Sequence, residues 1–415
     1  MAKNAKQVRR RRVFHIPGYD PMHPRRYREL YRTEGAAQAA ISGYRIRVQA
    51  ASSQDSFCWD VTGEFAKATV KSRIDVLMWS DIVRDSMAQS IPATYLQLLK
   101  TAWTYIGTGA LFRLMRLRKG PIIAALYPVV FLLAQLGIAV GAGWLLGGAA
   151  AQIVGAGTGE GAFAAWLALT AQWFVLGLVA TVILRWFKSL DNRVFAYYLT
   201  HDYAFSANAN GAYPERLEAR LDQFADQIAA ALQETTDEVL VVGHSSGAHL
   251  AISIVADLLR DGRVPRNGPT LSLLTLGQVV PMVSFLPKAD RLRADLKYLS
   301  ENDALAWVDV TAPGDGCCFA LCDPVAVSGV AGQSQKWPLV LSAAFTKTLS
   351  ASRWRQLRWR FFRLHFQYLC AFDQPQGYDY FQITAGPMTL RDRFAGRGHS
   401  RSRFAQAISK YRSVA

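Results

Sequence analysis

Residues 238–261 read EVLVVGHSSGAHLAISIVADLLRD. Four apolar residues of high strand propensity lead into Gly-His-Ser-Ser-Gly at 243–247, and a nearly all-apolar helical pattern follows. The stretch therefore predicts a buried strand, a tight turn and a buried helix. Glycines on both sides of Ser245 let the strand and the helix approach closely around that turn. A serine hydroxyl held there can meet both a base and backbone N–H groups, which a nucleophilic serine requires.

This strand, G-x-S-x-G turn and helix resemble the nucleophile elbow of the α/β-hydrolases, with Ser245 at the position of the nucleophile. The resemblance implies an α/β fold, with a mostly parallel sheet that carries helices on both faces. It also implies a serine hydrolase that forms an acyl-enzyme, with the backbone N–H of Ser246 in the oxyanion hole. The alternative is an ordinary Gly/Ser turn in a doubly wound sheet.

The family resemblance implies that an acid and a histidine follow the serine along the chain. Two histidines lie beyond the predicted helix, His365 and His399. His399 lies in the basic tail segment RGHSRSR, which is typical of a solvated chain, whereas His365 lies in FRLHFQYL among aromatic residues that can hold a ring. We therefore expect His365 to be the base. His244 and His249 are too close to the serine along the chain and are expected to pack beside the turn.

Three aspartates compete for the acid. A strand is predicted at 305–311, and a Pro-Gly turn directly before Asp315 can bring that carboxylate back toward the histidine. Asp309 lies within the predicted strand, where the alternation of side chains would point it to one face of the sheet. Asp323 comes later in the chain. The sequence favours Asp315, then Asp309, then Asp323, although an aspartate beside a glycine also commonly caps a turn.

A second part of the oxyanion hole is expected near the N-terminus. After a basic leader, Arg9 to Arg12, the segment VFHIPGYD at 13–20 predicts a short strand that ends in a Pro-Gly loop. In the α/β-hydrolases an early strand ends in such a loop, and Gly18 or Tyr19 is the candidate for the second N–H. A plain turn after an edge strand is the alternative.

The cysteines argue against both a disulfide framework and a zinc site. There are five, an odd number, and Cys317, Cys318 and Cys322 are crowded together. No C-x-x-C pair has a matching second half, and adjacent cysteines cannot easily serve one tetrahedral zinc ion. We expect reduced thiols, and the proposed chemistry requires no metal or organic cofactor.

Two long stretches carry no charge, residues 121–159 and 161–184. Each exceeds the roughly 20 apolar residues that a membrane helix needs. Basic residues lie before the first stretch and after the second, while the connecting loop carries only Glu160, so the positive-inside tendency places both ends in the cytoplasm. We expect a two-helix hairpin in the inner membrane of a bacterium, with a cytoplasmic catalytic domain. A buried hairpin in a soluble lid is the alternative.

Composition points to anionic partners. The net charge is +16, and apolar residues make up 51% of the chain against 19% charged. The N-terminal stretch 1–21 has no apolar segment after its arginines, so no secretory signal is expected. The segment 353–363, RWRQLRWRFFR, interleaves arginine with aromatic residues. It suits an anionic phospholipid surface, with a solvated helix face as the alternative, and nucleic acid is not expected as a partner.

The order of the predicted elements indicates one hydrolase domain with an insertion. Further strands are predicted at 44–48, 57–61 and 74–79, before the apolar hairpin, and at 271–280 after the elbow. We expect an N-terminal part of the hydrolase domain at 1–110, the membrane hairpin at 111–190, the C-terminal part at 191–390 and a basic tail at 391–415.

The expected function is cleavage of ester, thioester or amide bonds, with a lipid-like or otherwise amphipathic acyl substrate. The sequence leaves the substrate's identity and the oligomeric state open. Two alternatives remain: a hairpin that only tethers an enzyme for soluble esters, and a catalytically silent hydrolase fold that serves as a membrane scaffold.

Overall fold

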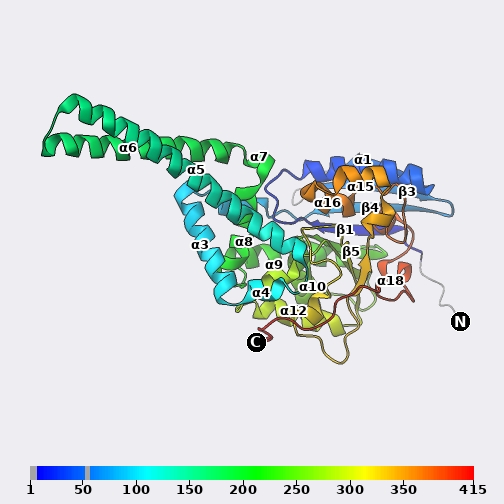
Figure 1. Cartoon of the computed structure of the whole chain (residues 1–415). Helices are drawn as coiled ribbons and strands as arrows, with labels where there is room; N and C mark the ends of the chain where they lie inside the picture. The colour runs from blue at the N-terminus through cyan, green and yellow to red at the C-terminus, as the bar shows by residue number, and fades with distance from the viewer. Residues whose placement is uncertain (1–6, 52–56) are drawn as a thin grey trace. The chain divides into compact units, whose positions relative to one another are not determined.

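The computed structural model describes residues 7–51 and 57–415 (Figure 1). Residues 1–6, part of the stretch in which no secretory signal is expected, lie outside the described residues, as do 52–56. The chain forms two compact units. The first comprises Met1–Asp85, Thr104–Ile122 and Ser206–Ala415, and the second comprises Ser86–Trp103 and Ile123–Phe205.

The first unit is built on one eight-stranded, mostly parallel sheet, which confirms the expected α/β class. The strand order is β2-β3-β4-β1-β5-β6-β7-β8. The β2–β3 and β3–β4 pairs are antiparallel, and β4, β1 and β5 to β8 run parallel. The strands are β1 Arg10–Ile16, β2 Arg45–Ala50, β3 Phe57–Phe65, β4 Ala68–Val76, β5 Glu238–His244, β6 Thr270–Leu276, β7 Leu305–Thr311 and β8 Leu339–Ser342.

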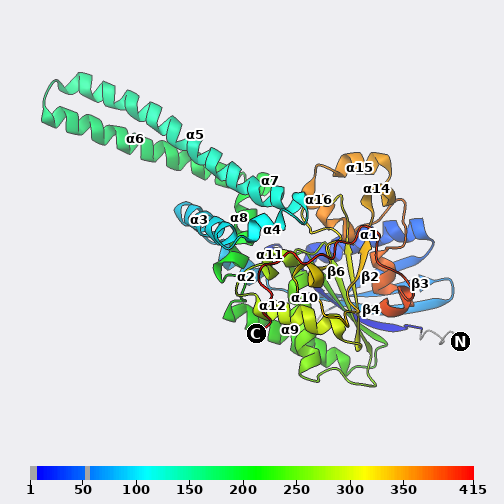
Figure 2. The same ribbon diagram turned by 60° about the horizontal axis from the view of Figure 1, so that its bottom comes forward.

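Helices cover both faces of this sheet (Figure 2). Helix α10 packs on β5 and β6 and contacts α9 and α12, whereas α1 and α17 pack on the face where Tyr27, Tyr31 and Trp59 join the hydrophobic core. The helices of the first unit are α1 Arg25–Ser42, α2 Ser80–Met87, α4 Ala110–Leu114, α9 Glu215–Leu232, α10 Gly247–Arg260, α11 Val280–Ser284, α12 Asp290–Glu301, α13 Pro324–Val327, α14 Phe345–Thr348, α15 Ala351–Leu357, α16 Phe361–His365, the 3-10 helix η1 Phe366–Leu369, α17 Tyr380–Ala385 and α18 Leu390–Arg393.

The supposed basic leader is part of the sheet, which corrects the sequence-based expectation. Strand β1 begins at Arg10, and the Arg11 side chain is fully buried. Its Nε donates to Glu238 Oε2 at 2.6 Å, and its terminal nitrogens donate to the carbonyls of Gly386 and Met388. Burying a guanidinium is tolerated because its charge is paired and its donors are satisfied. This network ties β1 to β5 and to the segment after α17.

The backbone at the end of β5 forms the expected tight turn. Ser245 has φ +58°, a left-handed conformation that is uncommon for a residue with a side chain. A β-carbon on Gly243 would lie 2.6 Å from Ala248 Cα, and one on Gly247 would overlap the carbonyl oxygen of Ile16. Glycine is therefore required at both positions, because strand, turn and helix pass too closely for a side chain.

The second unit contains most of α5 Lys119–Thr158 and all of α6 Ala162–Ser189, and both helices are long and apolar enough to span a membrane. Large apolar side chains along both helices are exposed, among them Trp144 and Phe174. Of the glycines expected to permit close packing, Gly143 and Gly147 lie against the α6 backbone, whereas Gly141 and Gly148 face open space. The unit's other helices are α7 Asp191–Val194, α8 Ala196–Asn208 and most of α3 Ile91–Gly107.

Candidate active site

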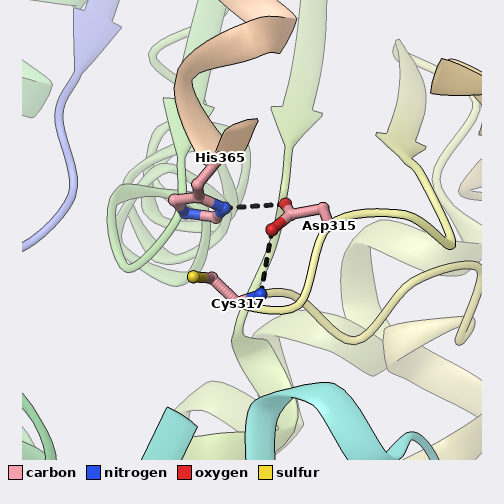
Figure 3. Close-up of side chains that lie close together, drawn as sticks. All are labelled: Asp315, Cys317 and His365. Atoms are coloured by element: carbon pink, nitrogen blue, oxygen red, sulfur yellow. Dashed lines mark hydrogen bonds and ion pairs between the residues drawn. The ribbon is translucent and has the colours of Figure 1, made fainter. Parts of the chain in front are cut away.

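Asp315 and His365 form a buried hydrogen-bonded pair. His365 Nδ1 lies 2.7 Å from Asp315 Oδ2, and Figure 3 shows the two side chains turned toward one another. Asp315 lies in the loop after β7, and His365 ends α16. A carboxylate can only accept, so His365 Nδ1 carries a proton, and in the neutral ring the lone pair is then on Nε2. The expected acid and the expected base therefore meet, fifty residues apart in the chain.

The Asp315 carboxylate is held in its charged form. Burial raises its pKa, but the charge of His365, the hydrogen bond from His365 and the N–H of Cys317 together outweigh burial, so the pKa lies below the ordinary value. Oδ1 accepts from Cys317 N at 2.9 Å, and Oδ2 also accepts from Tyr368 Oη at 2.9 Å. Three donors therefore fix both oxygens of one carboxylate.

The His365 ring is positioned from several sides. The neutral His244 donates from Nε2 to the His365 carbonyl at 3.0 Å, and the two ring centroids are 4.8 Å apart. Burial first, and then the charge of His365, hold the pKa of His244 well below its ordinary value, so His244 adds no positive charge beside His365. His365 itself is 5% exposed, and its Nε2 has no hydrogen-bond partner within the described part of the chain. An unpartnered buried nitrogen of this kind calls for a functional explanation.

Ser245 follows His244 at the carboxyl end of β5 and is half-buried. Its N–H donates to Leu276 O at 2.9 Å. The next residue, Gly277, has φ +53°, and a β-carbon there would lie 3.0 Å from His365 Cε1. The Leu276–Gly277 backbone therefore contacts both the serine backbone and the His365 ring.

The expected oxyanion residues also meet the elbow. A β-carbon on Gly18 would lie 2.9 Å from Ser245 Cβ and 3.4 Å from Ser245 Oγ. Tyr19 follows it and is buried, with its ring in an edge contact with Trp79. Ser246, on the other side of the serine, is buried at the start of α10. The loop after β1 and the start of α10 therefore both lie beside Ser245, as an oxyanion hole requires.

The other candidates have structural partners instead. Asp309 is buried within β7 and accepts from Thr275 Oγ1 at 2.7 Å. Asp323 caps α13 by accepting from the N–H groups of Val325 and Ala326, and it pairs with Arg403.

The two remaining histidines beyond β5 also lie in other surroundings. His399 is exposed, and its Nδ1 accepts from Val340 N. His249 Nδ1 contacts Tyr213 Oη at 2.9 Å.

Two contributions to the site were not foreseen. Tyr368 lies three residues after His365, and its hydroxyl donates to Asp315 and accepts from Ala312 N. The aromatic run around His365 was the available signal, although it does not say which ring carries the useful hydroxyl. The second is the Cys317 thiol, which lies two residues beyond Asp315.

Cys317 groups with the pair rather than with its neighbouring cysteines. Within residues 7–51 and 57–415, the group that could hold a metal ion is Asp315, Cys317 and His365, whose possible ligand atoms all lie within 4.8 Å of one another. Cys318 is buried against Tyr368 Oη, and Cys322 donates to Ala320 O. None of the five cysteines forms a disulfide.

The burial of Asp309 generates a prediction about pH. Burial, opposed by the hydrogen bond from Thr275, raises the pKa of Asp309 from 3.8 to about 8. The folded state therefore holds an extra proton between these values, so the contribution of Asp309 to stability is present below pH 4 and is lost as the pH rises to 8. The Asp309→Asn variant stays neutral, so its unfolding temperature at pH 8 should exceed that of the wild type by several degrees, with little difference at pH 4.

Thermal unfolding in detergent across this range measures the effect. The matched Asp323→Asn variant, which weakens a helix cap and an ion pair, should be less stable at every pH. Parallel pH curves for Asp309→Asn and the wild type would contradict the prediction.

No family model, curated protein or solved structure matches the chain. Its function must therefore be argued from the residues of this site.

Proposed function

We propose that the chain is a membrane-anchored serine hydrolase of the α/β-hydrolase type, which cleaves carboxylic ester bonds, or thioester or amide bonds, through an acyl-enzyme. The observation that carries the proposal is the Asp315–His365 hydrogen bond, with His365 Nε2 left without a hydrogen-bond partner among the described residues. An imidazole held in this tautomer by a carboxylate is the arrangement that activates a serine.

The proposed reaction has two halves. Ser245 Oγ attacks the substrate carbonyl while His365 Nε2 takes the hydroxyl proton, and Asp315 stabilises the resulting imidazolium. The N–H of Ser246 and that of Gly18 or Tyr19 hold the oxyanion. His365 then returns the proton to the leaving group. Water then loses a proton to His365 as its oxygen bonds the acyl carbon, the bond between that carbon and Ser245 Oγ breaks, and His365 returns the proton to Ser245 Oγ as the carboxylic acid product leaves.

The alternative is a catalytically silent hydrolase fold that acts as a membrane scaffold. A scaffold has no need of a buried imidazole whose Nε2 lacks a partner, or of a serine in a left-handed conformation. Both features cost free energy, and strain of this kind clusters at active sites. The same two features therefore favour the enzyme.

Loss of the base should abolish most of the activity. His365→Ala should lower turnover of a short p-nitrophenyl ester by about 10³-fold or more, whereas His399→Ala should change it little. A fluorophosphonate probe should label the wild-type protein at Ser245 and leave Ser245→Ala unlabelled. Equal turnover by His365→Ala and the wild type would exclude the assignment, and failure of the probe to label Ser245 would favour the scaffold.

We further propose that α5 and α6 cross the inner membrane of a bacterium and that the catalytic unit is cytoplasmic. The hairpin exposes apolar side chains along both helices, which argues against the buried hairpin of a soluble lid. The basic residues Arg113, Arg116 and Arg118 precede α5, and the loop between the helices carries only Glu160. This charge asymmetry favours an external loop.

Cysteine probes measure the orientation. A cysteine at Gly157, in the last turn of α5, should react with a membrane-impermeant reagent from the periplasmic side, whereas cysteines at Arg116 and Lys188 should react only after the membrane is opened. The background variant needs Cys317 and Cys370 replaced, since these two thiols are only half-buried. Reaction of all three positions from one side would mean that the hairpin does not cross.

A lipid-like acyl substrate is the best match to the surroundings of the site. The Asp315 loop packs against the first turn of α5, because a β-carbon on Gly120 would lie 2.9 Å from the Gly316 backbone. The same loop contacts α15 and α16, where Trp354 lies over Gly314 and Phe361 over Gly316. The proposed acid therefore lies next to the point where the apolar run begins.

The segment from α15 to α16 carries the features of a lipid-facing surface. Trp359 is 70% exposed and Phe361 is 48% exposed. Exposed arginines flank them, namely Arg355, Arg358, Arg360 and Arg363. Arginines can meet anionic headgroups while the rings enter the boundary region, so the charge and the aromatic residues act together.

Activity in lipid vesicles tests this surface. With the full chain reconstituted in anionic vesicles, Arg358→Glu and Trp359→Ala should each lower hydrolysis of a long-chain lipid ester at least about threefold, because each removes a contact worth about 1 kcal/mol. Hydrolysis of a short soluble ester should stay unchanged. Arg266→Glu, an exposed arginine in the loop between α10 and β6, serves as the control of equal charge. If the protein hydrolyses the soluble ester but no lipid ester, the lipid-like substrate is wrong and the hairpin serves only as a tether.

A further inference from the structure

The Cys317 thiol lies close to the His365 ring. In Figure 3 its sulfur lies below the ring, and the possible ligand atoms of Asp315, Cys317 and His365 lie within 4.8 Å of one another. The thiol is half-buried, and the loop that carries it is fixed because Cys317 N donates to Asp315 Oδ1. The proposed hydrolysis makes no use of this sulfur.

His365 is already arranged as a metal ligand. A histidine that binds zinc through one nitrogen commonly donates its other N–H to a carboxylate, which fixes the ring and raises its basicity. The Asp315–His365 hydrogen bond supplies that second interaction. His365 Nε2 is buried and lacks a hydrogen-bond partner among the described residues, so its lone pair is available.

We propose that Cys317 Sγ and His365 Nε2 together bind a thiophilic divalent cation, Zn²⁺ above all, and that the bound ion switches the hydrolase off. Thiolate and imidazole are the ligands that zinc prefers, whereas magnesium and calcium prefer oxygen. Ordinary Zn–N and Zn–S bonds at a tetrahedral ion bring the two ligand atoms to about 3.5 Å of one another. Water or Ser245 Oγ completes the coordination.

The binding step is a simple exchange of a proton for a metal ion. The Cys317 thiol loses its proton to solvent and its sulfur bonds the ion, while His365 Nε2 shares its lone pair and keeps its proton on Nδ1. Asp315 stays outside the coordination sphere, because both of its oxygens already accept hydrogen bonds. The occupied Nε2 can no longer take the serine proton. Inhibition rests on the proposed function, but metal binding does not.

Cobalt binding tests the site without reference to catalysis. Co²⁺ titrated into the full chain in detergent should give the near-ultraviolet charge-transfer absorption of a thiolate–cobalt bond, and excess Zn²⁺ should remove it. Cys317→Ala and His365→Ala should each weaken binding at least about tenfold. Cys370→Ala removes the other half-buried thiol and should leave binding unchanged. Thermal unfolding checks that each variant is folded, and Cys317→Ser replaces Cys317→Ala where it is not.

Zinc inhibition supplies the second readout. Hydrolysis of a short soluble ester, expressed relative to each variant's own metal-free rate, should fall with Zn²⁺ in the wild type and in Cys370→Ala. Cys317→Ala should need at least about tenfold more Zn²⁺ for the same inhibition. If cobalt binding depends on Cys317 but the chain hydrolyses no ester, the metal site stands and the proposed hydrolase activity is wrong. Absence of the thiolate–cobalt band in the wild type, or equal inhibition of the wild type and Cys317→Ala, would overturn the metal site.

Discussion

The close approach of two backbone segments is the constraint on which the site depends. The loop after β1 runs so near the start of α10 that a β-carbon on Gly247 would lie 2.5 Å from Pro17 O, and one on Gly18 would press against Ser245. Glycine at both positions lets two segments that are distant in the chain meet beside the serine. At the opposite end of the same strands, the Arg11–Glu238 pair links β1 to β5 in a fixed register. Strands β1 and β5 are therefore fixed by close backbone packing at the end near Ser245 and by the buried Arg11–Glu238 ion pair at the other end.

A second constraint concerns one imidazole ring. Asp315 orients His365, Tyr368 and the Cys317 amide orient Asp315, and His244 holds the His365 backbone. Whenever the ring is neutral, its lone pair is therefore on Nε2. A proton and a zinc ion compete for such a lone pair, so the features that make a good general base also make a good metal ligand. The Cys317 thiol beside the ring adds a second ligand, so the proposed site binds Zn²⁺ specifically.

The sequence predicted the parts of the site that depend on local pattern or on order along the chain. The strand, turn and helix around Ser245 follow from hydropathy and glycine spacing, and the order of acid and histidine led to the Asp315–His365 pair. The sequence places Arg11 in a basic leader because its partner Glu238 lies 227 residues away. The residues around Arg11 do not indicate an ion-pair partner so far away along the chain. The role of Tyr368 was missed for a related reason, since a tyrosine in an aromatic run does not reveal where its hydroxyl points.

The start of α5 bears on the substrate of the proposed enzyme. A helix of 40 residues rises about 60 Å, twice the hydrocarbon thickness of a bilayer, so α5 has length to spare. The first turn of α5 is not a polar spacer. Gly120 packs on Gly316, and the uncharged stretch begins at the next residue, Pro121. An enzyme tethered for soluble esters gains from a flexible polar linker that lets its site face the solvent. A site whose acid loop touches the first turn of the apolar helix is better suited to an acyl chain that leaves the bilayer, and this favours the lipid-like substrate over the simple tether.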